Sequence, residues 1–182
     1  MRTAHSIYKL GFFILTVSAI IVSSSKISFS ATTSLNAVVS PGSLTLQSPS
    51  IATISAVNLE GVTQVVEGEF GGIVVTDNRG SGSGWSVTIA SSDFSCCEPT
   101  RLIGAEFLTV DPGALSVISG KASGVVSGFK RRFSYKNEPI TLMTATTDSG
   151  MGSYSVSPKV SLQVPADAYA GDYSATVTIT VI

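Results

Sequence analysis

The stretch "YSATVTITVI", residues 173–182, decides the fold class of this chain. Its apolar residues fall at every second position, at Tyr173, Ala175, Val177, Ile179 and Val181. Serine or threonine fills the positions between them. Alternation with a period of two, in a segment rich in Val, Ile and Thr, is typical of a half-buried β-strand. The chain is therefore predicted to end in a strand that belongs to a folded sheet.

The same alternation recurs upstream, and turn signals separate the alternating segments. The strand-like segments are "SLTLQ" (43–47), "WSVTI" (85–89) and "KVSLQV" (159–164). The turn signals are "SPGS" (40–43), "EGEFGG" (67–72), "NRGSGSG" (78–84), "DPG" (111–113) and "PADAYAGD" (165–172). No helical stripe with caps stands out. Short strands with this punctuation predict one antiparallel, Greek-key-like β-sandwich, in which the irregular region 120–159 is an insertion or a loop-bearing hairpin.

The N-terminal 30 residues predict a secretory signal peptide. Basic residues precede an apolar run from Leu10 to Val22, and small residues follow it. The run is short of the ~20 residues that span a bilayer comfortably. We expect cleavage after Ser30, which leaves residues 31–182 as the single mature domain with no transmembrane segment. An uncleaved anchor is the alternative.

Composition narrows the function of the mature domain. Cleavage removes three of the 11 basic residues and none of the 12 acidic ones, leaving 8 against 12 and a formal charge of −4. A mildly acidic chain is not suited to nucleic acid. The single histidine, His5, is also lost, so neither a Ser-His-Asp or Cys-His site nor imidazole ligation of zinc is available. The acids Glu67, Glu69 and Asp77 have two interpretations, a glycosidase-like carboxylate pair or solvated strand charges. The second is favoured, so no enzyme, cofactor or metal site is expected.

The two cysteines, Cys96 and Cys97, are adjacent in "SDFSCCEP". Outside the cytoplasm a cysteine pair is expected to be oxidised. However, neighbouring Cα atoms lie about 3.8 Å apart, closer than in ordinary disulfides. Three interpretations stay open: a vicinal disulfide in a turn, two free thiols, or bonds to another chain.

Two stretches together resemble the WxL-domain family of bacterial surface proteins. They are "VVTDNRGSGSGWSVTIASSDF" and, about eighty residues later, "VSLQVPADAYAGDYSATVTITVI". The positions that match the family pattern are Asp77, Arg79, Gly80, Gly84 and Trp85 in the first half, and Gly171 and Tyr173 in the second. The first motif reads Trp-Ser-Val, and Ile179-Thr180-Val181 stands where the second Trp-x-Leu is expected. The resemblance implies a cell-surface protein that attaches non-covalently to peptidoglycan alongside partner surface proteins.

Trp85, the single tryptophan, has two interpretations. It begins a strand and shares a face with Val87 and Ile89, a pattern typical of the core, where Trp buries about 150–250 Å². Alternatively, its amphipathic indole is exposed and stacks on a glycan. The same-face partners favour the core.

The segment "FKRRFSYK", residues 129–136, is the second candidate contact. It holds half of the mature basic residues, and Lys130, Arg131, Arg132 and Tyr135 are its candidate contacts with an anionic wall polymer, a surface glycan or a partner surface protein. The alternative is an edge strand that charge protects from unwanted pairing. The second interpretation is favoured because exposed edge charges need no ligand.

The sequence thus predicts a secreted, non-catalytic surface protein that associates with the cell wall or with other surface proteins. The alternative is a structural subunit of a surface assembly that pairs through edge strands.

Overall fold

The computed structural model describes residues 29–50 and 52–182. The chain divides into two compact units, Met1–Val38 and Val39–Ile182. The predicted signal peptide lies almost wholly outside the described residues. Residues 29–38 of the first unit are exposed and lack regular secondary structure. Among the residues described, no helix is long and apolar enough to cross a membrane.

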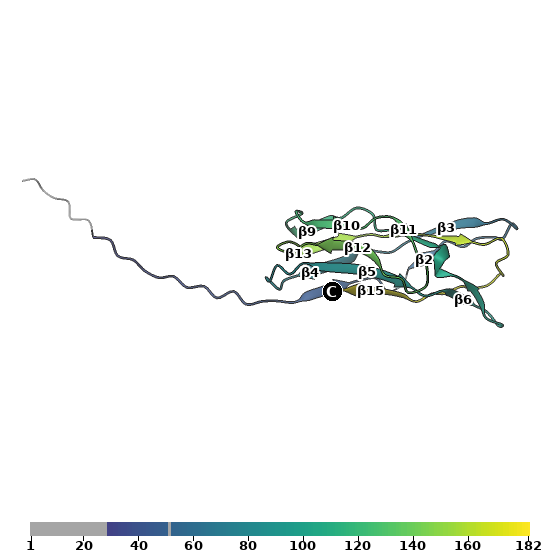
Figure 1. Ribbon diagram of the computed structural model, residues 1–182, viewed down its shortest axis with the longest axis horizontal. Helices are drawn as coiled ribbons and strands as arrows, with labels where there is room; N and C mark the ends of the chain where they lie inside the picture. The colour runs from purple at the N-terminus through teal and green to yellow at the C-terminus, as the bar shows by residue number, and fades with distance from the viewer. Residues whose placement is uncertain (1–28, 51) are drawn as a thin grey trace, which may run out of the picture. The chain divides into compact units, whose positions relative to one another are not determined.

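The second unit is built from β-strands and one short 3₁₀ helix, η1 (Figure 1). The bounds are β1 (Leu44–Gln47), β2 (Thr53–Ile54), β3 (Gln64–Glu69), β4 (Ile73–Asp77), β5 (Trp85–Ser91), β6 (Phe94–Cys96), β7 (Arg101–Ile103), η1 (Ala105–Phe107), β8 (Leu108–Asp111), β9 (Ser116–Gly120), β10 (Val125–Ser127), β11 (Arg131–Arg132), β12 (Ile140–Ala145), β13 (Gly152–Val156), β14 (Lys159–Val164) and β15 (Val177–Val181).

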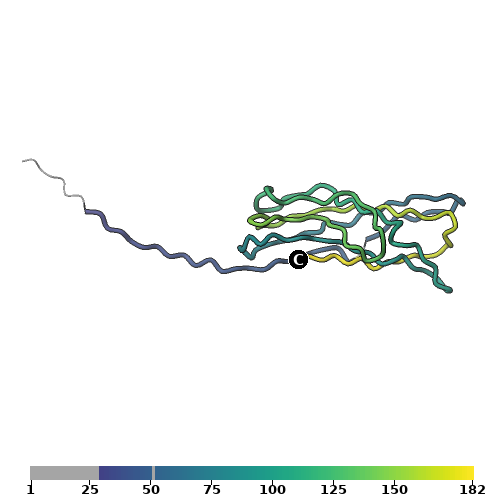
Figure 2. Tube along the Cα trace, in the orientation of Figure 1, coloured from purple at the N-terminus to yellow at the C-terminus, as the bar shows by residue number. Residues whose placement is uncertain are grey.

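One layer of the second unit consists of two sheets, ordered β1-β4-β13-β9 and β2-β3-β14-β8-β11. β3 is followed by β4, and β13 by β14, after short breaks. β4 pairs antiparallel with β13, and β3 pairs antiparallel with β14. The Phe70 N–H donates to the Pro158 oxygen at 2.8 Å. This hydrogen bond continues the pairing where both strands are interrupted. The trace in Figure 2 shows these strands running along the long dimension of the unit.

The other layer is the sheet β10-β12-β5-β15. β5 lies inside it, and its residues alternate between buried and half-buried because one face meets the opposite layer. Side chains from both layers form one core cluster, in which Ile73, Val75, Val87 and Leu142 are fully buried. The predicted all-β class and antiparallel pairing are confirmed.

The C-terminal segment belongs to the sheet, as its alternation predicts. β15 pairs antiparallel with β5, with Val177 opposite Ser91 and Val181 opposite Val87. Reciprocal backbone hydrogen bonds extend this pairing at both ends, between Ser174 and Ser95 and between Ile182 and Ser86. β15 is the last strand of its sheet.

The interpretation of 120–159 as an insertion or a loop-bearing hairpin is wrong. The region supplies β12 and β13, and both lie in the interior of their sheets. Their turn-rich flanks obscure the alternation: Leu142 and Met143 are adjacent and both fully buried, at the point where the β12–β5 register shifts. A bulge of this kind interrupts the alternation of buried and exposed side chains from which a strand is predicted.

Candidate functional site

The Asp-x-Arg-Gly motif forms a clasp at the end of β4. The side chain of Asp77 is fully buried, so its interpretation as a solvated strand charge is wrong. Arg79 donates from Nε to Oδ1 and from a terminal nitrogen to Oδ2, each at 3.0 Å, and its backbone N–H also donates to Oδ1 at 3.0 Å. The same terminal nitrogen donates to the Gly84 oxygen at 2.7 Å. The motif therefore ties both ends of the glycine-rich turn to β4.

The charges of Asp77 and Arg79 in the clasp neutralise each other. Hydrogen bonding from the Arg79 side chain is the main cause that lowers the pKa of Asp77, against the opposing effect of burial. The reciprocal bond raises the pKa of Arg79. A bidentate guanidinium–carboxylate pair is among the strongest neutralising contacts in proteins. Asp77 and Arg79 thus serve the fold and present little net charge to a ligand.

The motif glycines allow two loops to pack. Gly84 has φ +71, and a Cβ there would lie 2.5 Å from the Ala145 oxygen. Gly80 adopts φ +67, also in the left-handed region that favours glycine. The Asp148 N–H donates to the Gly82 oxygen at 2.7 Å, so the turn after β4 and the turn after β12 are joined.

Trp85 lies in the core at this junction. It is 4% exposed, and its Nε1 donates to the Gly150 oxygen at 2.9 Å. Its ring packs on Tyr154, with centroids 5.7 Å apart. This is the core position that the same-face pattern favours. A buried indole with its N–H already bonded is not placed to stack on a glycan.

The second motif position lies beside the first. Val181 of β15 pairs with Val87 of β5, and Ile179 pairs with Ile89. Both Ile179 and Val181 are half-buried against the core. The two motif segments therefore make neighbouring strands of one sheet, with the tryptophan of the first in the core.

Cys96 and Cys97 form a disulfide with each other, the first of the three interpretations left open by the sequence. Cys97 has φ +67. Gly171 packs directly on the sulfurs, since a Cβ at this position would lie 2.3 Å from the Cys97 Sγ. Gly171, which matches the family pattern in the second half of the chain, thus leaves space for the turn that holds Cys96 and Cys97. Tyr173, two residues on, is half-buried and packs against the core.

The basic segment lies at a sheet edge. β11 pairs with β8 and ends its sheet. Arg131 forms an ion pair with Glu138, and Arg132 donates to the Glu106 backbone oxygen. The Arg132 guanidinium also lies 5.4 Å from the centre of the Phe107 ring. The Ser134 N–H, which donates to Glu138, is the main cause that lowers the pKa of this carboxyl, with a contribution from Arg131.

Three exposed side chains flank the anchored arginines. Phe129 is 88% exposed and Tyr135 is 59% exposed, and Lys130 between them is also exposed. We call Phe129, Lys130, Arg131, Arg132 and Tyr135 the β11 surface. The sequence brought out its charge and its edge position; the exposure of Phe129 follows from the tertiary structure alone.

Glu67 and Glu69, the other two acidic residues considered in the sequence, lie outside the clasp. Glu67 and Glu69 are exposed on β3, as expected for solvated strand charges. Across residues 29–50 and 52–182, no group of three or more His, Cys, Asp or Glu side chains could hold a metal ion.

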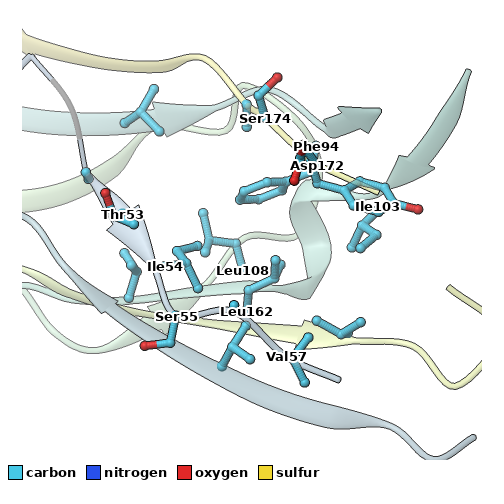
Figure 3. A pocket seen from close by; sticks show the side chains of 18 of the residues that line it. Thr53, Ile54, Ser55, Val57, Phe94, Ile103, Leu108, Leu162, Asp172 and Ser174 are labelled. Atoms are coloured by element: carbon cyan, nitrogen blue, oxygen red, sulfur yellow. The ribbon is translucent and has the colours of Figure 1, made fainter. Parts of the chain in front are cut away.

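The structure also contains a groove of about 1060 Å³, lined by both apolar and polar residues, that no sequence pattern predicts (Figure 3). It is lined from one layer by side chains such as Ile54, Leu108 and Leu162, and from the other by Phe94 and the segment before β15. Alternation predicts that these side chains face inward, and it does not show that the two layers separate here.

Comparison with known proteins identifies the family. A family model described as WxL domain, surface cell wall-binding, matches residues 21–181. No curated protein and no solved structure is significantly similar to the chain. The match spans both motif halves, the clasp and the terminal strand pair described above. The chain belongs to the WxL domain family of surface, cell wall-binding proteins.

Proposed function

We propose that this cell wall-binding protein contacts an anionic wall polymer or peptidoglycan through the β11 surface, and that it has no catalytic activity. The observation that carries the proposal is the exposure of Phe129 beside Lys130. A phenylalanine exposed at 88% is costly to maintain in water. Larger exposed apolar patches rimmed by polar residues mark interaction sites, and this segment exposes the two aromatic side chains Phe129 and Tyr135 beside its basic residues.

The arginines of the β11 surface are held in place before any ligand arrives. Glu138 fixes Arg131, and the Glu106 oxygen with the Phe107 ring fixes Arg132. A side chain held in one geometry loses less entropy on binding. Guanidinium groups suit phosphate and carboxylate, the charged groups of anionic polymers. Lys130 adds a cation that extends from the same edge.

The test is sedimentation with purified cell walls. We expect the triple variant Lys130→Ser, Arg131→Ser, Arg132→Ser to bind less and to lose most of its salt dependence, because screening acts on the charges removed. Lys130→Ser and Phe129→Ser, each alone, should weaken binding without breaking the Arg131–Glu138 pair. Lys121→Ser, which removes an exposed charge elsewhere, is the matched control.

An opposite result would support edge protection. If the triple variant binds walls as the wild type does and aggregates more readily, the charges of β11 act against edge-to-edge pairing. The proposed contact would then be wrong.

We further propose that residues 1–30 direct export and are cleaved, which leaves 31–182 as the mature domain. N-terminal sequencing of the exported protein should begin at Ala31. A protein that retains its first residues in the envelope would instead show an uncleaved anchor.

A further inference from the structure

The two layers of the second unit differ in how they end on their two sides. On one side, β1 ends its sheet and β15 ends the opposite layer, and these two strands lie close to each other. On the other side, β9 and β10 end their sheets and are joined by the short turn 121–124 (Figure 1). In the described part of the chain, β13 is the one strand hydrogen-bonded to β9. β9 is therefore a free sheet edge.

The edge strand β9 lacks the usual protection of a free edge. All of its residues are exposed, and Ile118 is 60% exposed. It holds no charged residue and no proline. Soluble proteins usually protect such an edge with charge, with proline or with a covering segment. Val126 of β10 and Met151, just before β13, are also exposed, which adds apolar surface beside this edge.

The sequence of β9 is complementary to itself. Ser116-Val117-Ile118-Ser119 is polar, apolar, apolar and polar when read from either end. An antiparallel pair of two such strands, with a two-fold axis between Val117 and Ile118, sets Val117 opposite Ile118 and Ser116 opposite Ser119. Packed apolar pairs and hydroxyl pairs directly opposite each other stabilise antiparallel sheets. The Ser119 hydroxyl accepts from the Ser153 N–H at 3.1 Å and keeps its own hydrogen for a second partner.

The charges that flank β9 favour the antiparallel direction. The nearest charged residues along the chain are Asp111 before the strand and Lys121 after it. In an antiparallel pair, the end that carries Lys121 in one copy lies beside the end that carries Asp111 in the other. A parallel pair would set like charges at the same end, which is unfavourable. The edge therefore fits a second copy of itself in one direction.

We propose that two copies of this chain pair through β9, antiparallel about a two-fold axis between Val117 and Ile118. The sheet β1-β4-β13-β9 then continues into the same sheet of the second copy. Because each copy uses the same surface, the contact closes a dimer and does not extend into a filament. A contact through one short strand is at the low end of interface sizes, so we expect a reversible dimer.

A register shift within β9 offers the competing explanation. Ser119 lies opposite Ser153 and Val117 lies opposite Tyr154, so Ile118 has no partner on β13. A bulge at an edge either re-aims a side chain or twists the edge away from further pairing. The first effect agrees with the exposure of Ile118 and with a dimer. The second effect predicts a monomer.

The first test measures the mass of the exported chain by light scattering across a concentration series. The wild type should rise from the monomer mass to twice that mass and no further. Ile118→Lys should raise the dissociation constant by about tenfold or more, because two symmetric apolar pairs are lost and two lysines meet near the axis. The matched control is Val65→Lys, which changes a 62% exposed residue on β3, a strand with a neighbour on both sides. It should dimerise as the wild type does, and thermal unfolding should show both variants folded.

The second test uses cysteines to check the register. Residues directly opposite in an antiparallel pair have Cα atoms about 4.5–5.5 Å apart, within the range of a disulfide. Ser116→Cys with Ser119→Cys should therefore form a covalent dimer under mild oxidation. Either substitution alone should not, since three residues, about 10 Å, separate each position from its own copy. The Cys96–Cys97 bond is present in every variant, so exchange with it would cross-link the single variants as well.

Three results would overturn the proposal. A wild type that is monomeric at every concentration shows that the bulge protects the edge. A double-cysteine variant that does not cross-link has no partner strand at β9. Single variants that cross-link as readily as the double one make contact in another register. Cell walls enter neither measurement, so none of these results bears on binding through the β11 surface.

Discussion

At the scale of single residues, the WxL positions of this chain are structural. Asp77 and Arg79 close the glycine-rich turn, and Trp85 fixes the turn after β12 through its bond to the Gly150 oxygen. A Cβ on Gly150 would lie 2.6 Å from the Trp85 Nε1, so this contact also requires glycine. The motif therefore marks how two distant loops are joined.

Replacing Asp77 by Asn should lower the free energy of unfolding near neutral pH. It should also make that free energy change less as the pH is lowered. The folded pKa of Asp77 is lowered, so the unfolded chain takes up this proton first as pH falls. The ionised carboxylate therefore stabilises the fold above about pH 4 and loses that effect below it. Urea titrations from pH 7 to pH 3 should show the difference between wild type and Asp77→Asn shrinking. A difference that grows toward acid would contradict the clasp.

Replacing Trp85 by Phe should cost about 2–4 kcal/mol, from the volume lost in the core and the buried Gly150 oxygen left unpaired. Circular dichroism during urea unfolding measures it, because the variant has no tryptophan to follow. Ser86→Ala, on the other face of β5, is the control and should change stability by less than about 0.5 kcal/mol. Equal loss in both variants would argue against a special role for the indole.

At the scale of elements, the terminal strand supports the sheet and leaves an edge open. β15 pairs with Val87 to Ser91 of β5, and no strand among the described residues is hydrogen-bonded to its other side, where β1 lies close to it. β11 is likewise an edge, but one that carries charge. The two edges thus differ in charge, since the terminal strand segment β15 carries no charged residue and β11 consists of two arginines.

Deleting Gly171 to Ile182 should prevent folding, because β5 would lose a neighbour and the core would lose a wall. Solubility and cooperative thermal unfolding measure this. Deleting residues 31–38, which precede the second unit, is the control and should leave the fold intact. A truncated chain without the last strand that is soluble, monomeric and cooperatively folded would sink the idea.

At the scale of the whole molecule, stability rests on one core shared by two layers. The buried cluster draws on β3 to β5 as well as on β12 to β14, and thus on residues about one hundred positions apart. The Cys96–Cys97 bond joins neighbours and closes no long loop. Removing this disulfide should change the entropy of the unfolded chain little, because the entropic effect of a crosslink grows with the number of residues in the loop that it closes.

Chelation should leave the melting temperature unchanged. The mature chain is predicted to need no metal, and the described acids do not gather into a ligand set. Thermal unfolding with and without EDTA measures this. A fall of several degrees would reveal a cation site among the acids.

The sequence by itself determined the all-β class, the strand segments with clean alternation and the family. These follow from local patterns, because a period of two in side-chain polarity is set by the strand itself. The Asp77–Arg79 pairing can also be expected from the sequence, because the two residues are only two positions apart.

The tertiary structure alone decided which strands are neighbours, and with them the groove, the contact of Trp85 with Gly150 and the interior place of β12 and β13. Trp85 and Gly150 are 65 residues apart, and nothing near either residue specifies the other. Pairing and register depend on how all inward faces pack together at once. A local pattern therefore shows that a side chain faces inward, and only the packed layers show whether it meets a partner or an open groove.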